Sequence, residues 1–212
     1  MTAQNQTKLT TNVYIDGFNL YYGSLKGTAF RWLDLRAFAQ ALLPNHSVRE
    51  IYYFTARMKG DLLSEAKQES YWQALSHHAG VHIIEGHFLR HQVNMPMVSP
   101  PPPNARVWKT EEKGSDVNLA SYLLRDAFLG NAEQFLVITN DSDLATPIRL
   151  VREHKLPIGV ALPVSNPGRH PSVQLRQVAT FVREIRPAAL RRAQLPNSVA
   201  VGRSNVVKPS NW

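Results

Sequence analysis

Four aspartates of this 212-residue chain stand where strands should end or helices begin. Asp16 and the pair Asp141 and Asp143 each follow a short apolar run, and Asp116 starts an amphipathic helical pattern. The chain is basic overall, with 24 Lys and Arg against 16 Asp and Glu. Mg²⁺ and Mn²⁺ prefer carboxylate oxygens, and such an ion can activate water and neutralise charge on a phosphate. The four aspartates therefore predict a divalent-metal site for phosphodiester chemistry.

The apolar pattern alternates between strand and helix, which is typical of an α/β domain with a mostly parallel sheet. We expect five core strands at 12–15, 48–55, 81–88, 134–139 and 157–162, and a short extra strand at 107–109. We expect helices after Asp34 and at 61–78, 116–129 and 144–154, with a helix or helix–strand pair at 173–185. The predicted fold class is a single Rossmann-like, three-layer α/β/α domain.

These elements should bring the aspartates to one edge of the sheet. In open parallel sheets, ligands bind beyond the C-terminal ends of the strands, where the strand order reverses. The expected order of the five core strands is 3-2-1-4-5, which makes the strands before Asp16 and Asp141 neighbours. Asp116 begins the helix that leads into the second of these strands. Carboxylates gathered in this way raise each other's pKa values, and a bound cation relieves their repulsion.

Composition limits the class of protein. With 43% hydrophobic and 19% charged residues, the chain resembles a folded globular domain. It has no cysteine, which excludes disulfides and thiolate ligands and agrees with a reducing compartment. No apolar run is long enough to cross a bilayer, and the polar N-terminus lacks the core of a signal peptide. We therefore expect a cytoplasmic protein that does not bind membranes.

Two segments depart from the regular pattern. Residues 92–106 contain Pro96 and four further prolines at 100–103, so we expect an irregular excursion from the core. Residues 186–212 hold five basic residues and no acid, and therefore most of the net charge of +8. We predict an N-terminal extension at 1–11, one domain at 12–186 and a basic, flexible tail at 187–212.

Taken together and in this order, the motifs resemble NYN-domain proteins of the LabA-like group, which are relatives of the PIN-domain nucleases. The resemblance rests on residues 14–19, 113–117, 139–144 and 158–160 and spans about residues 12–185. It implies a PIN-like fold and a ribonuclease that depends on a divalent metal. Asp16, Asp116, Asp141 and Asp143 would be the catalytic and metal-binding residues, with Asn19 in support. Asn140 stands where many relatives have Gly, a change expected to affect the turn.

Each aspartate also has a simpler interpretation. Asp16 precedes Gly17, and Asp-Gly favours tight turns. Asp116, Asp141 and Asp143 lie at helix starts, where a carboxylate caps free N–H groups and suits the helix dipole. Lys113 is a supporting candidate that would contact phosphate or balance the carboxylates, although it is equally a solvated lysine.

Other residue types are weaker candidates. Phe18, Tyr21, Tyr22 and Trp32 surround the first motif, and we favour core packing over stacking on unpaired bases. The eight histidines lack cysteine partners and the spacing of a helical zinc site, which favours surface or structural roles.

The leading hypothesis is an endoribonuclease that hydrolyses RNA with Mg²⁺ or Mn²⁺. RNA is the expected partner, DNA is an open alternative, and a homo-oligomer is compatible with the sequence. The main rival is a non-catalytic RNA-binding or regulatory protein that retains the acidic pocket. A phosphatase of the haloacid-dehalogenase type ranks lower, because it would want Asp-x-Asp after the first strand, where this chain has Asp16-Gly17-Phe18.

Overall fold

The computed structural model describes residues 8–98, 104–165, 168–210 and 212. Within these residues the chain builds a seven-stranded sheet in the order β4-β3-β2-β1-β5-β6-β7. All neighbouring strands are parallel except β3 and β4. The strands are β1 Thr10–Asp16, β2 Ser47–Ala56, β3 His82–Pro96, β4 Asn104–Lys113, β5 Gln134–Ile138, β6 Ile158–Ala161 and β7 Phe181–Arg183.

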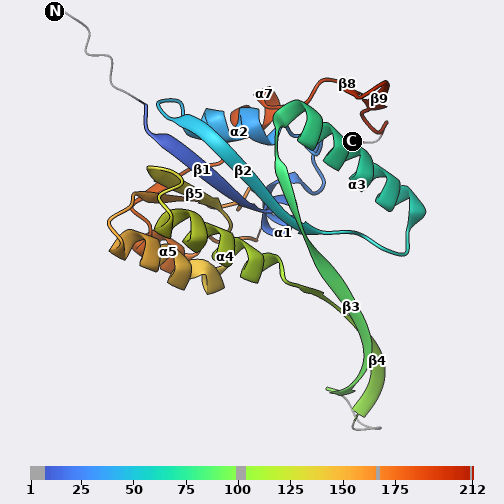
Figure 1. Cartoon of the computed structure of the whole chain (residues 1–212). Coiled ribbons are helices and arrows are strands. Elements are labelled where there is room, and N and C mark those ends of the chain that lie inside the picture. The colour runs from blue at the N-terminus through green and yellow to red at the C-terminus, as the bar shows by residue number, and fades with distance from the viewer. Residues whose placement is uncertain (1–7, 99–103, 166–167, 211) are drawn as a thin grey trace, which may run out of the picture.

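Helices cover both faces of this sheet (Figure 1). They are α1 Gly17–Leu20, α2 Leu35–Leu42, α3 Leu62–Ala74, α4 Ser115–Phe128, α5 Ala145–Glu153, α6 Val173–Val178 and α7 Pro187–Arg192. A separate two-stranded ribbon is formed by β8 Ser198–Val201 and β9 Ser204–Val207. Among the described residues, no helix combines the length and the apolar character needed to cross a bilayer.

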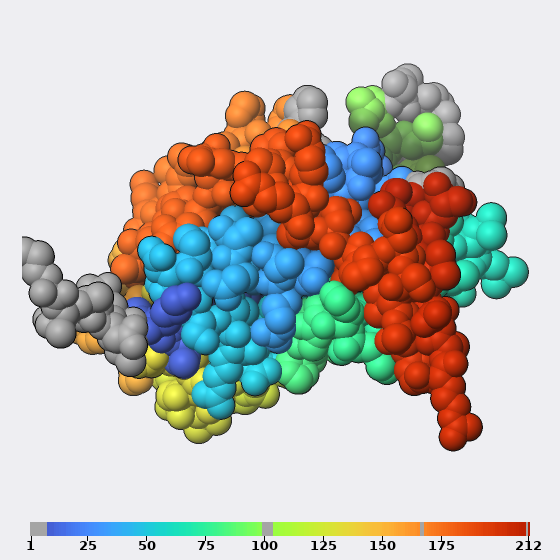
Figure 2. Space-filling view, turned by 90° about the horizontal axis from the view of Figure 1, so that it is seen from above, coloured from blue at the N-terminus to red at the C-terminus, as the bar shows by residue number. Residues whose placement is uncertain are grey.

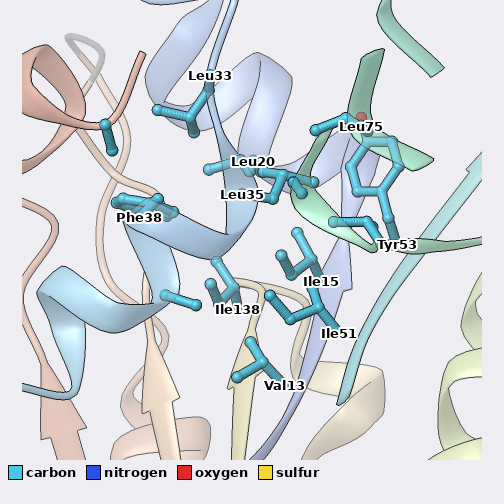
Figure 3. Packing of buried hydrophobic residues seen from close by; sticks show 14 of the residues in the cluster. Val13, Ile15, Leu20, Leu33, Leu35, Phe38, Ile51, Tyr53, Leu75 and Ile138 are labelled. Atoms are coloured by element: carbon cyan, nitrogen blue, oxygen red, sulfur yellow. The ribbon is translucent and has the colours of Figure 1, made fainter. Parts of the chain in front are cut away.

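The two faces form two apolar cores because side chains alternate along each strand. Val13 and Ile15 of β1 point to the face covered by α2, α3 and α7, where they lie near Ile51 and Ile138 (Figure 3). Tyr14 points to the other face, which α4, α5 and α6 cover. The three-layer α/β/α fold is therefore confirmed, and its central strand β1 is buried on both sides.

The expected order of the five core strands is confirmed, and the structure adds one strand at each edge. β7 extends the sheet beyond β6, and β4 pairs antiparallel with β3. The expected short strand at 107–109 is part of the ten-residue β4.

The expectation of an irregular excursion at 92–106 is wrong for its described residues. β3 continues to Pro96 and β4 begins at Asn104, so these residues form the outer part of a long hairpin. β3 tolerates Pro96 because this residue lies at the very end of the strand, where it interrupts no inner ladder bond. The prolines at 100–103 lie outside the described residues, as do residues 1–7 of the expected N-terminal extension.

The prediction of a flexible tail does not hold for the described part of 187–212. These residues form α7, β8 and β9, and Leu190, Leu195 and Val199 are buried in the core. The indole nitrogen of Trp32 donates to the Pro196 carbonyl at 2.8 Å. Figure 2 shows this segment in red, spread across the outside of the molecule. Its apolar residues are spaced too irregularly to predict a helix or strand, yet they pack against α2 and α3.

Candidate acidic site at the C-terminal edge of the sheet

The first and fourth predicted core strands, β1 and β5, are direct neighbours. Their register pairs Ile15 with Ile138, so Asp16 and the segment after Ile138 emerge side by side from the C-terminal edge. Asp16 ends β1 and caps α1, and Asp141 caps the short 3₁₀ turn Ser142–Leu144. The structure therefore brings the first and third predicted motifs together, as the expected strand order requires.

Asp16 is 3% exposed and is held by three donors. Its Oδ1 accepts from the Asn19 backbone N–H at 2.9 Å. Its Oδ2 accepts from the Asn19 side-chain amide at 2.6 Å and from the Thr139 hydroxyl at 2.8 Å. Burial raises the pKa of Asp16 above its ordinary value, these hydrogen bonds oppose the rise, and the charge of Asp141 adds to it. Asn19 thus holds the Asp16 carboxylate in place through two hydrogen bonds.

Thr139 is a site residue without a predicted role. Its hydroxyl donates to Asp16 and accepts from the Asp141 backbone N–H at 3.0 Å, so it links the two aspartates. A threonine directly after a buried strand is a weak signal, because the same residue type is common in strands. Only the pairing of β1 with β5 gives Thr139 this place.

Asp141 and Asp143 have different surroundings. Asp141 is half-buried and its Oδ1 accepts from the Asp143 backbone N–H at 3.0 Å. Asp143 is exposed. Asp141 therefore caps the turn, as its simpler interpretation predicts, and its charge also reaches Asp16. Asn140 binds the neighbouring loop through the His170 carbonyl at 3.0 Å and the Ser172 N–H at 2.8 Å, which is a role in the turn.

Asp116 lies in the first turn of α4, close to the other acids. Partial desolvation raises the pKa of Asp116 from 3.8 to about 6, and the charges of Asp16, Asp141, Glu112 and Asp143 add to the rise. All four predicted aspartates therefore interact, together with a fifth carboxylate. The Glu112 side chain reaches the start of α4, where its carboxylate accepts from the Ser115 N–H at 3.2 Å and from the Ser115 hydroxyl at 2.7 Å.

The structure does not bring Lys113 to the acids. Its ammonium group pairs with Glu111 at 3.2 Å, on the other side of the hairpin from Glu112. Side chains of consecutive strand residues point to opposite sides, which explains why Glu112 joins the site and Lys113 does not. A role for Lys113 in support of the site thus lacks a contact with it.

The raised pKa of Asp116 predicts a stability effect with a defined sign. The folded state binds this proton more tightly than the unfolded state, so ionisation of Asp116 opposes folding as the pH rises from about 4 to about 6. Without divalent metal, Asp116→Asn is expected to raise the free energy of unfolding by about 1 kcal/mol at pH 7.5, after allowance for the exposure of Asp116. Below about pH 4 the gain should vanish. Urea denaturation in chelator at both pH values measures it.

Glu111→Gln is the matched control, because Lys109 and Lys113 lower the pKa of Glu111 and its charge favours folding. This variant should show no gain at pH 7.5. An equal gain from Asp116→Asn at both pH values would contradict charge repulsion as its cause.

The residues fit a hydrated hard cation better than a fully enclosed one. Within the described residues, no three His, Cys, Asp or Glu side chains are close enough to hold a metal ion as a complete set of ligands. Mg²⁺ commonly binds through one or two carboxylates and keeps several waters. Carboxylate oxygens whose pKa values are raised by desolvation and by the charges of neighbouring carboxylates have the chemistry such an ion requires.

A pocket of about 310 Å³ adjoins the acidic edge at the start of α1. Its lining is largely aromatic with several cations, and includes Phe18, Tyr21, Tyr22, Phe88, Lys26 and Lys67. Trp32 is fully buried in the core, as the packing interpretation predicts. Phe18, Tyr21 and Tyr22 line the pocket instead, so these side chains can pack against their neighbours and also contact a ligand.

A sheet of this order with acids at its C-terminal edge is the arrangement of the PIN-like nuclease superfamily. The NYN domain family matches residues 10–194, and the chain belongs to this family. A Pseudomonas putida protein named 6-hydroxy-3-succinoylpyridine 3-monooxygenase HspA is 34% identical over 238 aligned residues, which cover 96% of this chain and 75% of that protein.

A crystal structure of a protein of unknown function from Vibrio parahaemolyticus is similar in fold. It superimposes with a TM-score of 0.55 at 15% identity and covers 87% of this chain and 98% of that chain. At this identity the similarity supports the α/β fold and says nothing about the reaction.

Proposed function

We propose that this NYN-domain protein is a divalent-metal-dependent endoribonuclease. One observation carries the proposal: Asp16, Asp141 and Asp143 lie close enough to Asp116 at the C-terminal edge of the sheet that their charges add to the rise that desolvation causes in its pKa. Carboxylates with raised pKa values are typical of catalytic sites. Membership of a PIN-like nuclease family supports hydrolysis of phosphodiester bonds as the reaction.

The residues have separable roles in this proposal. Asp16 and Asp116 would hold Mg²⁺ or Mn²⁺, with Asp141 and Asp143 binding its waters. Asn19 and Thr139 fix the Asp16 carboxylate, since they donate to both of its oxygens. The bound ion would lower the pKa of a water and neutralise charge on the phosphate. With such a nucleophile, the chain needs no nucleophilic side chain of its own.

Cleavage of RNA by the purified full-length protein tests the proposal. With Mn²⁺ present, a labelled single-stranded RNA of mixed sequence should be cut internally, and excess chelator should abolish cutting until Mn²⁺ is restored. Fragments separated on a denaturing gel provide the readout. Asp143→Asn should reduce cutting, whereas cutting that survives chelator would point to a contaminating metal-independent ribonuclease.

The rival from the same fold is an RNA-binding protein without activity. It shares the acids but would not need a bound cation. Calorimetric titration of the RNA-free protein with Mn²⁺ separates the two, because saturable binding that Asp16→Asn removes supports the nuclease. RNA binding without any saturable metal binding would favour the rival.

A second candidate function comes from a different class. The relative named as a monooxygenase is 34% identical over nearly the whole of this chain, and the aromatic, cationic pocket beside Asp16 suits a flat ring that bears an anionic group. Ring hydroxylation would consume dioxygen and a two-electron reductant. Measurement of oxygen uptake with 6-hydroxy-3-succinoylpyridine and NADH tests this second function. Uptake that is coupled to loss of the pyridine would favour the monooxygenase over the nuclease.

A further inference from the structure

The β3–β4 hairpin projects from the body on the side where β1 and β2 end (Figure 1). Its register pairs Phe88 with Glu112, Arg90 with Thr110, Gln92 with Trp108 and Asn94 with Arg106. Paired residues of antiparallel strands point to the same side, and the sides alternate along each strand. The even-numbered residues 88–94 and 106–112 therefore share one side of the hairpin, here called the site side.

The inner end of the site side touches the acidic edge. The Phe88 ring packs edge-on against Phe18 of α1, with ring centroids 6.0 Å apart. Its register partner Glu112 contacts Ser115 and acts on Asp116. These contacts at the base show that this side, and not the opposite one, is continuous with the candidate site.

Farther out, the site side combines a cation with an aromatic ring. The Arg90 guanidinium lies over the Trp108 ring, 4.7 Å from its centroid. Trp108 is 58% exposed, although its ring is large and mostly apolar. Arg106 follows two residues from Trp108, and Gln92 and Asn94 are exposed beside them. In the described part of this side, Glu112 at the base is the single acid.

The opposite side of the same hairpin has a different character. It presents Leu89, Val93 and Val107, and its cations Lys109 and Lys113 are both paired with Glu111. The two sides share the same backbone and lie at the same distance from the body. Among the described residues, the site side combines an exposed aromatic ring with cations that have no acidic partner, and the opposite side lacks this combination. Each side therefore serves as a control for the other.

We propose that the site side of the hairpin binds single-stranded RNA and leads it to the acidic edge. A base would stack on Trp108, and phosphates would contact Arg90 and Arg106. Residues 88–94 span about 20 Å of strand, a length that suits several nucleotides. This inference rests on the proposed function, because it assigns the surface that delivers the substrate of that site.

Binding of a fluorescent 12-nucleotide RNA to the full-length Asp143→Asn protein tests the inference. Fluorescence anisotropy in chelator measures binding without cleavage. Trp108→Ala is expected to weaken the Kd about 5- to 150-fold, because stacking contributes about 1–3 kcal/mol per base. Arg106→Ala is expected to weaken binding and to lower the slope of log K against log salt by about 0.7.

Lys109→Ala is the matched control, since it removes one exposed cation from the opposite side of the same strand. It should leave both the Kd and the salt slope close to those of the parent. Equal losses from Arg106→Ala and Lys109→Ala, or no loss from Trp108→Ala in folded protein, would overturn the inference. Tighter binding of a DNA strand of the same sequence would overturn RNA as the ligand.

The failure of this inference is distinguishable from failure of the proposed function. If the hairpin variants bind RNA normally while the parent protein still cleaves it, only the inference fails. If Trp108→Ala abolishes binding but no metal-dependent cleavage occurs, only the proposed nuclease fails.

Discussion

Replacing Asp16 by asparagine is expected to lower metal-dependent RNA cleavage by about 100-fold or more while the protein stays folded. The Asp16 carboxylate accepts from Asn19 and Thr139 through both oxygens. An amide has one oxygen, so its NH₂ group would face a donor and it would carry no charge to bind a cation. The initial rate of cleavage at saturating Mn²⁺ measures the loss.

Glu111→Gln is the matched control for Asp16→Asn. It removes a carboxylate one residue from Glu112, but its charge pairs with Lys109 and Lys113 on the opposite side of the hairpin. Cleavage should therefore stay within about twofold of the parent. A rate for Asp16→Asn within that same range, with normal circular dichroism, would contradict a catalytic role for Asp16.

Replacing Asp126 by alanine is expected to have the opposite effect, with a large loss of stability and no loss of chemistry. Asp126 is 0% exposed and accepts from the Tyr14 hydroxyl at 2.7 Å, the Asn131 amide at 2.9 Å and the Arg125 guanidinium at 2.7 Å. Alanine would leave these donors without their acceptor, at a cost of about 3–5 kcal/mol in the free energy of unfolding. Urea denaturation measures this cost.

Asp61→Ala provides the comparison for Asp126→Ala, since Asp61 is an exposed cap of α3. Loss of such an exposed cap costs much less stability than loss of a buried acceptor. At a temperature where Asp126→Ala remains folded, its cleavage rate should match the parent. A stability loss no larger than that of Asp61→Ala would show that the buried network is not a major source of stability.

The pH dependence separates structural from site aspartates. Burial alone would raise the pKa of Asp126, but hydrogen bonds from Tyr14 and Asn131 and the charge of Arg125 outweigh it and lower the pKa. Asp126 therefore stabilises the fold at neutral pH, and this contribution is lost as the pH falls through its lowered pKa. Asp16 and Asp116 have raised pKa values, so their ionisation costs stability. Such a cost is expected of charged groups that serve the proposed function and do not stabilise the fold.

The two comparisons point to different reactions. The NYN match covers residues 10–194, whereas a relative that shares 34% identity carries the name of a monooxygenase. One fold commonly hosts several reactions, and the chemistry depends on the site. The prediction for Asp16 and the metal-dependent cleavage assay therefore carry more weight than either name.

Much of the fold was predictable because its signals are local. Runs such as 135–138 are apolar throughout and mark strands buried on both faces. Asp34 and Asp61 mark helix starts, since each caps the helix that follows it. The order of the core strands followed from the reversal expected of such sheets and the right-handed connections of parallel strands.

The remaining features depend on pairing between distant residues. The hairpin extends to Pro96 because residues 92–96 find partners at 104–108, which a count of prolines does not reveal. The C-terminal segment is ordered because Leu190 and Val199 meet a surface built by α2 and α3. Neither segment has a periodic pattern that predicts its structure alone.

The sequence by itself determined which four aspartates interact and which strands carry them, because each stands at the end or start of a locally encoded element. Tertiary structure alone decided that Thr139 links Asp16 to Asp141, that Glu112 joins the acids, and that Lys113 turns away from them. The physical reason is that strand alternation and strand pairing set the direction of a side chain, and both depend on partners far along the chain.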